Sequence, residues 1–103
     1  MTDCLFCKII AKEIPTEFVY QDEEVSVFKD IRPKARVHLL VVPSAHVERF
    51  LDLKDRQFDV LTKMAKVIQR LIKEQELDSS YHLVINGGAR QEIAHLHWHL
   101  LGD

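Results

Sequence analysis

Short runs of β-branched and aromatic residues alternate with turn residues along much of the chain. The runs at 18–21 and 25–28 predict two strands, with the acidic residues between them in a solvated turn. Residues 37–42 are almost wholly apolar, which predicts a central strand that Pro43 ends. A fourth strand is expected at 81–86.

Apolar residues at three- and four-residue steps predict one long helix that begins near Asp52. Its stripe consists of Phe58, Leu61, Ala65, Ile68 and Ile72, widened by Met64 and Leu71. Residues 4–12 predict a short N-terminal helix or turn. Ser44 is a plausible N-cap for a helical turn that ends near Phe50.

These elements predict an α+β fold in a single domain that spans residues 1–103. Strands joined by short turns indicate a mainly antiparallel sheet, and the striped helix is expected to cover one face. Charged residues make up 29% of the chain and the formal net charge is −2, which argues against nucleic-acid binding through bulk electrostatics.

No apolar stretch approaches the roughly 20 residues that span a bilayer, and no secretory signal is recognisable. We therefore expect no membrane partner and a cytoplasmic location. Two cysteines favour thiols or metal ligands over a disulfide framework.

Three histidines occupy alternate positions near the end of the chain, at His95, His97 and His99. In a fifth strand they would share one face, with successive rings roughly 6–7 Å apart. That spacing suits a metal ion or a phosphate group between two rings. The alternative interpretation is a solvated edge strand that is rich in histidine.

A neutral imidazole is a good nucleophile near pH 7, so phosphoryl or nucleotidyl transfer is one chemistry for this run. His97, with a neighbour on each side, is the best placed nucleophile. Alternating histidines can also chelate a metal ion that activates water, and the pattern leaves this alternative open.

Cys4 and Cys7 form a C-x-x-C pair, which is half of a zinc site. Two buried thiols or a redox pair fit the same spacing. The chain has no second C-x-x-C pair, so histidines would have to complete a tetrahedral zinc site.

Residues 95–101 fit the alternating signature of the histidine triad (HIT) superfamily, which the chain resembles over nearly its whole length. Residues 4–15, 28–33 and 38–46 are similar to the opening, the nucleoside-binding loop and the central strand of its Hint branch. The order of these motifs is that of the family.

The resemblance implies a HIT-like five-stranded antiparallel sheet that continues across a homodimer. It also implies a purine nucleotide-binding protein that hydrolyses nucleoside 5′-phosphoramidates to an amine and AMP or GMP. His97 would be the nucleophile, His99 would stabilise the phosphate charge, and His38 would belong to the same catalytic cluster. Asp30 matches the ribose-binding carboxylate, and Asn86 lies where the family has an asparagine near the phosphate.

Six apolar residues match the family's base pocket, although ordinary core packing is the alternative for each: Phe6, Ile9, Ile14, Phe28, Ile31 and Leu40. Glu92 stands where several members carry a serine that can protonate the leaving amine. Some members bind structural zinc through residues that correspond to Cys4, Cys7, His46 and His95. A zinc-bound His95 would not be available to the leaving group, whereas a metal-free His95 would join the catalytic residues.

We therefore predict a phosphoramidase that needs no cofactor for its chemistry and carries structural zinc. Two other functions remain open. One is a dinucleoside polyphosphate hydrolase of the same superfamily, and the other is a nucleotide-binding regulatory or scaffold module in which catalysis is incidental.

Overall fold

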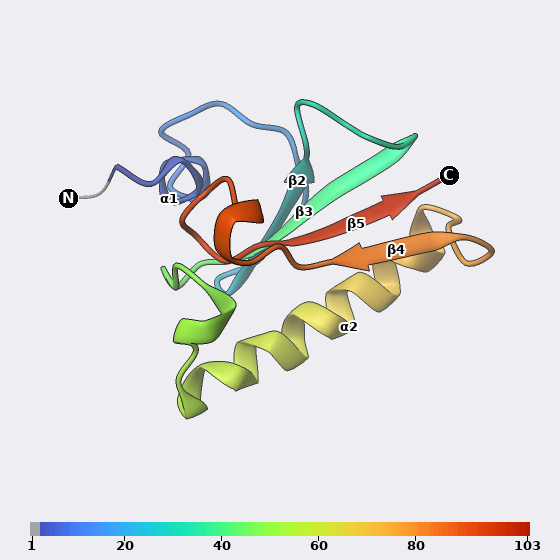
Figure 1. The fold of residues 1–103 in the computed structure, drawn as a ribbon. Helices are drawn as coiled ribbons and strands as arrows, with labels where there is room; N and C mark the ends of the chain where they lie inside the picture. The colour runs from blue at the N-terminus through green and yellow to red at the C-terminus, as the bar shows by residue number, and fades with distance from the viewer. Residues whose placement is uncertain (1–2) are drawn as a thin grey trace.

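The computed structural model describes residues 3–103 and contains one five-stranded antiparallel sheet between two helices (Figure 1). The strands lie in the order β1-β2-β3-β5-β4. Their bounds are β1 (Phe18–Gln21), β2 (Val25–Lys29), β3 (Val37–Pro43), β4 (Tyr81–Val84) and β5 (Trp98–Gly102). The helices are α1 (Leu5–Ile10) and α2 (Phe58–Glu74), with short 3-10 turns η1 (Phe50–Asp52), η2 (Asp55–Gln57) and η3 (Gly88–Arg90). This is the α+β architecture that the sequence predicts.

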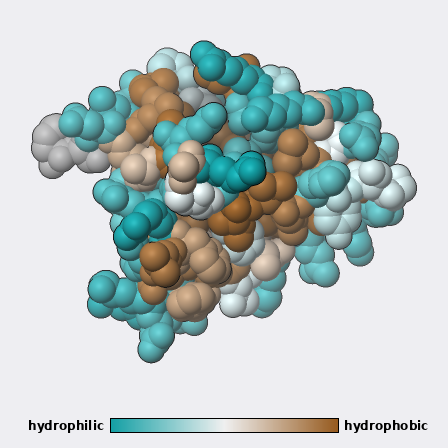
Figure 2. All heavy atoms as spheres, viewed as in Figure 1, coloured by the Kyte–Doolittle hydropathy of each residue, from teal (hydrophilic) through white to brown (hydrophobic). Residues whose placement is uncertain are grey.

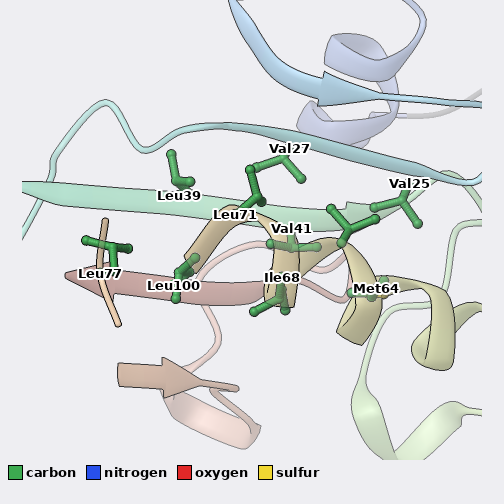
Figure 3. Packing of buried hydrophobic residues seen from close by; sticks show 10 residues of the cluster. Val25, Val27, Leu39, Val41, Met64, Ile68, Leu71, Leu77 and Leu100 are labelled. Carbon is green, nitrogen blue, oxygen red and sulfur yellow. The ribbon is translucent and has the colours of Figure 1, made fainter. Parts of the chain in front are cut away.

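The long helix α2 covers one face of the sheet, where the larger part of the core lies (Figures 1 and 3). Directly paired residues share a face, so Leu39 and its β5 partner Leu100 both point toward α2. The buried residues of this cluster are Val25, Val27, Leu39, Val41, Met64, Val67, Ile68, Leu71, Leu77 and Leu100. Such a fully buried side chain stabilises the fold by about 1.5–3 kcal/mol.

The short helix α1 packs on the opposite face. There Phe6 and Ile9 contact a second apolar cluster with Phe28, Leu40 and Val42. Strand register places His99 opposite Leu40, so the ring of His99 belongs to this face. The histidine chemistry and the main core thus lie on different sides of the sheet.

Both helices end in hydrogen bonds of the Schellman type, with a non-glycine residue in the left-handed region. After α2, Glu76 has a φ of 57° while the N–H of Leu77 donates to Ile72 O over 2.8 Å. After α1, Lys12 has a φ of 64° and the N–H of Glu13 donates to Lys8 O over 2.9 Å. Leu77 is thereby turned back into the core.

The long helix begins later than the sequence predicts, at Phe58 rather than near Asp52. Residues 55–57 form a 3-10 turn first, because the side chain of Gln57 accepts from the Lys54 N–H over 2.8 Å. The predicted helical turn after Ser44 is also wrong. The Ser44 N–H instead donates to Glu24 O and extends the pairing of β2 and β3.

Four residues of α2 are buried, and three of them, Met64, Ile68 and Leu71, belong to the predicted stripe, whereas Val67 does not. Ala65 is exposed, and Phe58 is about half exposed. The apolar surface of α2 is therefore wider than the part that this sheet covers.

The histidine run is only partly a strand, which corrects the prediction that three rings share one strand face. Strand β5 begins at Trp98, and two hydrogen bonds divert the chain before it. The His95 N–H donates to Ile93 O over 2.8 Å in a three-residue turn, and the Leu96 N–H donates to Val47 O over 2.6 Å. Among residues 3–103, no helix is both long and apolar enough to cross a membrane.

Candidate functional site

Two imidazole rings from neighbouring strands meet on the α1 face of the sheet. His38 comes from β3 and His99 from β5, and Nε2 of His38 lies 2.9 Å from Nδ1 of His99. His38 is buried and His99 is partly buried. A cross-strand arrangement of this kind holds both rings rigidly, because each belongs to a paired strand.

Hydrogen bonds fix which nitrogen of each ring carries the proton. The main-chain N–H of Lys34 donates to Nδ1 of His38 over 3.1 Å, so neutral His38 carries its hydrogen on Nε2. That hydrogen is directed to Nδ1 of His99, which leaves the hydrogen of neutral His99 on Nε2. A single main-chain donor thus determines the tautomers of both rings.

His97 precedes β5, and its ring lies 5.0 Å from the ring of His99 between centroids. Its Nδ1–H donates to the carbonyl oxygen of His95 over 2.7 Å. Neutral His97 therefore has an unprotonated Nε2 with an available lone pair. The edge of Phe6 packs against the His97 ring with a centroid distance of 5.0 Å.

Burial favours the uncharged form of two site rings, those of His99 and His38. It lowers the pKa of His99 to about 4, with smaller contributions from the neighbouring His97 and His38. Burial also lowers the pKa of His38, although the carboxylate of Asp30 opposes this shift. Both rings are thus neutral hydrogen-bonding groups rather than fixed cations.

Two polar side chains flank these rings. Asp30 Oδ2 lies 3.4 Å from Nε2 of His38, and Oδ1 accepts from the Arg32 N–H over 2.9 Å. Nδ2 of Asn86 lies 3.4 Å from Nε2 of His99. Since Nε2 of His99 carries a hydrogen in this tautomer, a hydrogen bond between the two requires the Asn86 amide to be turned with its oxygen toward the ring.

The apolar residues assigned to a base pocket do not behave alike. Phe6, Ile9, Phe28 and Leu40 are buried against one another, and Ile14 is partly buried beside them. Ile31 is 91% exposed. The four buried residues form a packed floor near His97, and Ile31 stands outside it.

A second cluster consists of Cys4, Cys7, His46 and His95, whose ligand atoms all lie within 4.8 Å of one another. Nδ1 of His95 lies 3.2 Å from Cys4 Sγ and 3.2 Å from Nδ1 of His46. Cys7 Sγ lies 3.4 Å from Nδ1 of His46. Tetrahedral zinc with bonds of about 2.0–2.3 Å requires separations of this order.

The protonation state of His95 fits a metal ligand. Its Nε2–H donates to the carbonyl oxygen of Pro43 over 2.8 Å, so neutral His95 turns an unprotonated Nδ1 toward the two cysteines. Burial lowers the pKa of this ring. Two sulfurs and two imidazole nitrogens in this arrangement match the donor set of structural zinc sites.

Glu92 lies beside this second cluster. It lines a surface pocket of about 380 Å³ together with Asp3, Cys4, His46 and Glu48. A smaller pocket of about 170 Å³ is lined by Asp30, His38 and Arg36 among others. His97 lines neither of them. His82 is exposed on β4 and belongs to neither cluster.

Sequence reasoning could not locate the main-chain partners of these rings, which are the N–H of Lys34 and the carbonyl oxygens of Pro43 and His95. Every residue carries such groups, so no residue type marks their position. The contact of Phe6 with His97 is a missed side-chain feature, and only its aromatic character near the N-terminus could have indicated it.

The fold and these two clusters define a small α+β protein whose polar interior consists mainly of histidine side chains. A family model described as "Scavenger mRNA decapping enzyme C-term binding" matches residues 3–103. The 14 kDa zinc-binding protein of Brassica juncea is 36% identical over 104 residues, which cover 97% of this chain and 92% of that protein.

Two solved structures are also similar. A HIT family hydrolase from Legionella pneumophila has a TM-score of 0.94 and 38% identity, covering 97% of this chain and 92% of its own. A histidine triad nucleotide-binding protein from Candida albicans has a TM-score of 0.86 and 33% identity, covering 95% and 73%. The chain belongs to the histidine triad (HIT) superfamily.

Proposed function

We propose that the chain hydrolyses purine nucleoside 5′-phosphoramidates through a covalent nucleotidyl intermediate on His97. The observation that carries the proposal is the 2.7 Å hydrogen bond from Nδ1–H of His97 to His95 O. It leaves Nε2 with a lone pair in a partly apolar site. The similarity to the Legionella HIT family hydrolase and to the Candida nucleotide-binding protein supports a hydrolytic, nucleotide-directed role.

In the first step, Nε2 of His97 attacks the α-phosphorus and the P–N bond breaks. The leaving amine takes a proton from Glu92, and a phosphorus–nitrogen bond to His97 replaces the bond that was lost. Water then attacks the same phosphorus and gives a proton back to the Glu92 carboxylate, while the bond to His97 breaks, which releases the nucleoside monophosphate and restores the ring. Each step is a displacement with no oxidation or reduction.

His99 stabilises the charge that develops on the phosphate oxygens. Its Nε2–H is a donor because Nδ1 is occupied by His38. A preorganised donor in a partly buried site interacts strongly with a forming oxyanion. Asn86, placed at the same nitrogen, would turn its amide toward either His99 or the phosphate.

For the nucleoside, we propose that Asp30 accepts hydrogen bonds from the two ribose hydroxyls, which are adjacent donors. Phe6, Ile9, Phe28 and Leu40 supply the apolar floor, and Ile14 and Ile31 would close over the base. Glu92 is the proposed acid for the leaving amine, and it lines the pocket that Cys4 and His46 also line.

We also propose that Cys4, Cys7, His46 and His95 hold a structural zinc ion. The zinc ion would tie α1 to the segment before β5, and its chemistry is not required for the displacement at phosphorus. The zinc-binding relative from Brassica juncea supports this assignment.

A homodimer is the proposed assembly, because apolar side chains are exposed along the edge strand β4. Tyr81, Leu83 and Ile85 alternate along this edge, and Leu83 is 49% exposed. Figure 2 shows apolar residues at the surface on the side of the molecule that carries β4.

The flank of α2 that is turned toward β4 is also apolar. Lys63 of α2 pairs with Asp22 and Glu24, and Arg70 lies over the Tyr20 ring, so this flank faces β1. Helical geometry then turns the opposite flank, with Phe58, Leu61, Ala65 and Ile72, toward β4. A second copy would cover both surfaces. Sedimentation equilibrium should report a dimer that Leu83→Lys dissociates and that Leu51→Lys, at an exposed site of η1, leaves intact.

The test of the hydrolase is release of AMP from an adenosine 5′-phosphoramidate with no added metal. His97→Ala should lower kcat/KM by at least about 10³-fold while circular dichroism and thermal unfolding stay unchanged. His82→Ala is the matched control and should retain full activity. Acid quenching of the wild type should trap a nucleotidyl adduct that the His97→Ala variant does not form.

Turnover by His97→Ala at the wild-type rate contradicts the proposal. Parallel assays on a dinucleoside polyphosphate separate the two hydrolase functions, since only the leaving group differs. Tight nucleotide binding with negligible turnover of both substrates would instead establish a regulatory module.

A further inference from the structure

His95 participates in both clusters through different atoms. Its ring nitrogen Nδ1 lies 3.2 Å from Cys4 Sγ and 3.5 Å from Cys7 Sγ. Its carbonyl oxygen accepts from Nδ1–H of His97 over 2.7 Å. One residue thus connects a group of metal-ligand side chains to the ring that we assign as nucleophile.

The His95 ring is anchored on both sides. Its side chain is fully buried, and Nε2–H donates to Pro43 O at the end of β3. The tight turn from Ile93 leaves the main chain at His95 outside the β5 ladder. The peptide that carries the His95 carbonyl is held on one side by the Leu96 N–H, which donates to Val47 O, and on the other by the anchored ring of His95. The position of that oxygen therefore depends on the ring as well as on this main-chain bond.

The ligand atoms of the cluster are spaced so that they could share one cation. Nδ1 of His46 and Nδ1 of His95 lie only 3.2 Å apart, and the latter carries a lone pair. A metal ion or a proton between these two nitrogens would relieve the repulsion that arises if both carry lone pairs. A metal ion also engages both sulfurs, which a proton shared by the rings does not.

The cluster is open to solvent on one side. Cys4 and His46 line the pocket of about 380 Å³, and three carboxylate side chains, Asp3, Glu48 and Glu92, surround it. The negative charge of these groups favours entry of a cation. Exchange of the ion with solvent therefore does not require unfolding of the core, which lies on the other face of the sheet.

We propose that metal occupancy of this cluster positions His97. The bound ion fixes the ring of His95, the His95 carbonyl then holds Nδ1–H of His97, and Nε2 is kept unprotonated and aimed. The role of His97 as nucleophile rests on the proposed function, whereas the position of its ring does not. His95 is accordingly a positioning residue, and loss of the ion lowers the rate without removing a group that contacts substrate.

The experiment compares zinc-loaded and chelator-treated protein labelled with ¹⁵N-histidine. Long-range ¹H–¹⁵N spectra should show a single Nδ1–H tautomer of His97 with zinc and a mixture of tautomers without it. Cys7→Ser should reproduce the mixture, and kcat should fall about 10- to 100-fold with KM nearly unchanged. Met64→Ala, a core change on the opposite face, should lower stability and leave the tautomer unchanged.

An unchanged His97 tautomer in folded, zinc-free protein overturns the inference. If zinc removal unfolds the chain, zinc-loaded Cys7→Asp replaces the zinc-free sample, because aspartate keeps an anionic ligand at this position. An unchanged His97 tautomer and an unchanged kcat in this variant would also overturn the inference. Inactivity of the zinc-loaded wild type refutes the proposed function alone, because the spectra report the ring without turnover.

Discussion

Nε2 of His38 donates to Nδ1 of His99 over 2.9 Å, and this bond has a fixed direction because the Lys34 N–H occupies the other nitrogen of His38. Lys34, a loop residue four positions before His38, therefore determines which nitrogen of His99 carries the hydrogen that can be donated to a ligand. The Lys34 N–H and the rings of His38 and His99 act as one unit, so loss of the Lys34 donor should be detectable at His99.

Replacement of Lys34 by proline removes the main-chain donor, whereas replacement by alanine keeps it. We expect Lys34→Pro to release the tautomer of His38 and to lower kcat by about 10- to 100-fold, since the donor on His99 is no longer fixed. Lys34→Ala should have nearly wild-type kinetics. Equal activity of the two variants would show that the main-chain bond does not set the tautomer.

Stability should depend on pH through His99. Burial lowers its pKa in the folded state to about 4, from a usual value of about 6.5. Between these values the unfolded chain binds more protons than the folded one. The free energy of unfolding should therefore be constant above about pH 6.5 and fall as the pH decreases toward 4.

Guanidinium unfolding at several pH values measures this slope. His99→Gln should show a shallower slope over the same range, because one of the buried rings that must be kept neutral is removed. A slope in the variant as steep as in the wild type would assign the effect to other groups.

Asp30 has two candidate roles that kinetics can separate. If its carboxylate binds the ribose, Asp30→Asn should raise KM about tenfold with little change in kcat, because a charge-assisted hydrogen bond is weakened. The variant should also lose the preference of the wild type for a ribose over a 2′-deoxyribose substrate. A fall in kcat at constant KM would instead indicate that Asp30 acts through His38, whose Nε2 lies 3.4 Å away.

Gly102 at the end of β5 is required by close packing. A Cβ atom at this position would lie 2.2 Å from Cδ2 and 2.9 Å from Cγ of the buried Leu77. Gly102→Ala should therefore lower the free energy of unfolding by about 1–3 kcal/mol. Gly87→Ala is the control, since a Cβ there meets no atom within 4 Å and should cost much less. Similar losses in the two variants would contradict the packing argument.

Most of the sheet could be predicted from the sequence because its strands carry local signals. β1 spans the expected residues 18–21, and β2 and β3 each extend one residue beyond the prediction. The start of α2 could not be predicted in the same way. Asp52 has the chemistry of an N-cap, but the Gln57 side chain bonds to the Lys54 N–H and a 3-10 turn forms before the helix.

The sequence predicted which residue types form the candidate site, but it did not predict how they are arranged. Strict alternation indicated one strand with three equivalent histidines. Bonds to Val47 and Ile93 turn the chain before β5, so the ring of His95 lies among Cys4, Cys7 and His46 instead. Such long-range main-chain contacts leave no mark in the local pattern. The roles assigned to the site residues stay predictions until the variants are assayed.

Neighbouring positions of β3 serve opposite faces of the sheet, with His38 among the imidazoles and Leu39 in the core beneath α2. Deletion or insertion of a single residue within this strand would exchange the two sets, placing an imidazole in the hydrophobic core and a leucine beside His99. The strand therefore tolerates a change of length less well than a conservative substitution, because only the former moves every side chain to the other face.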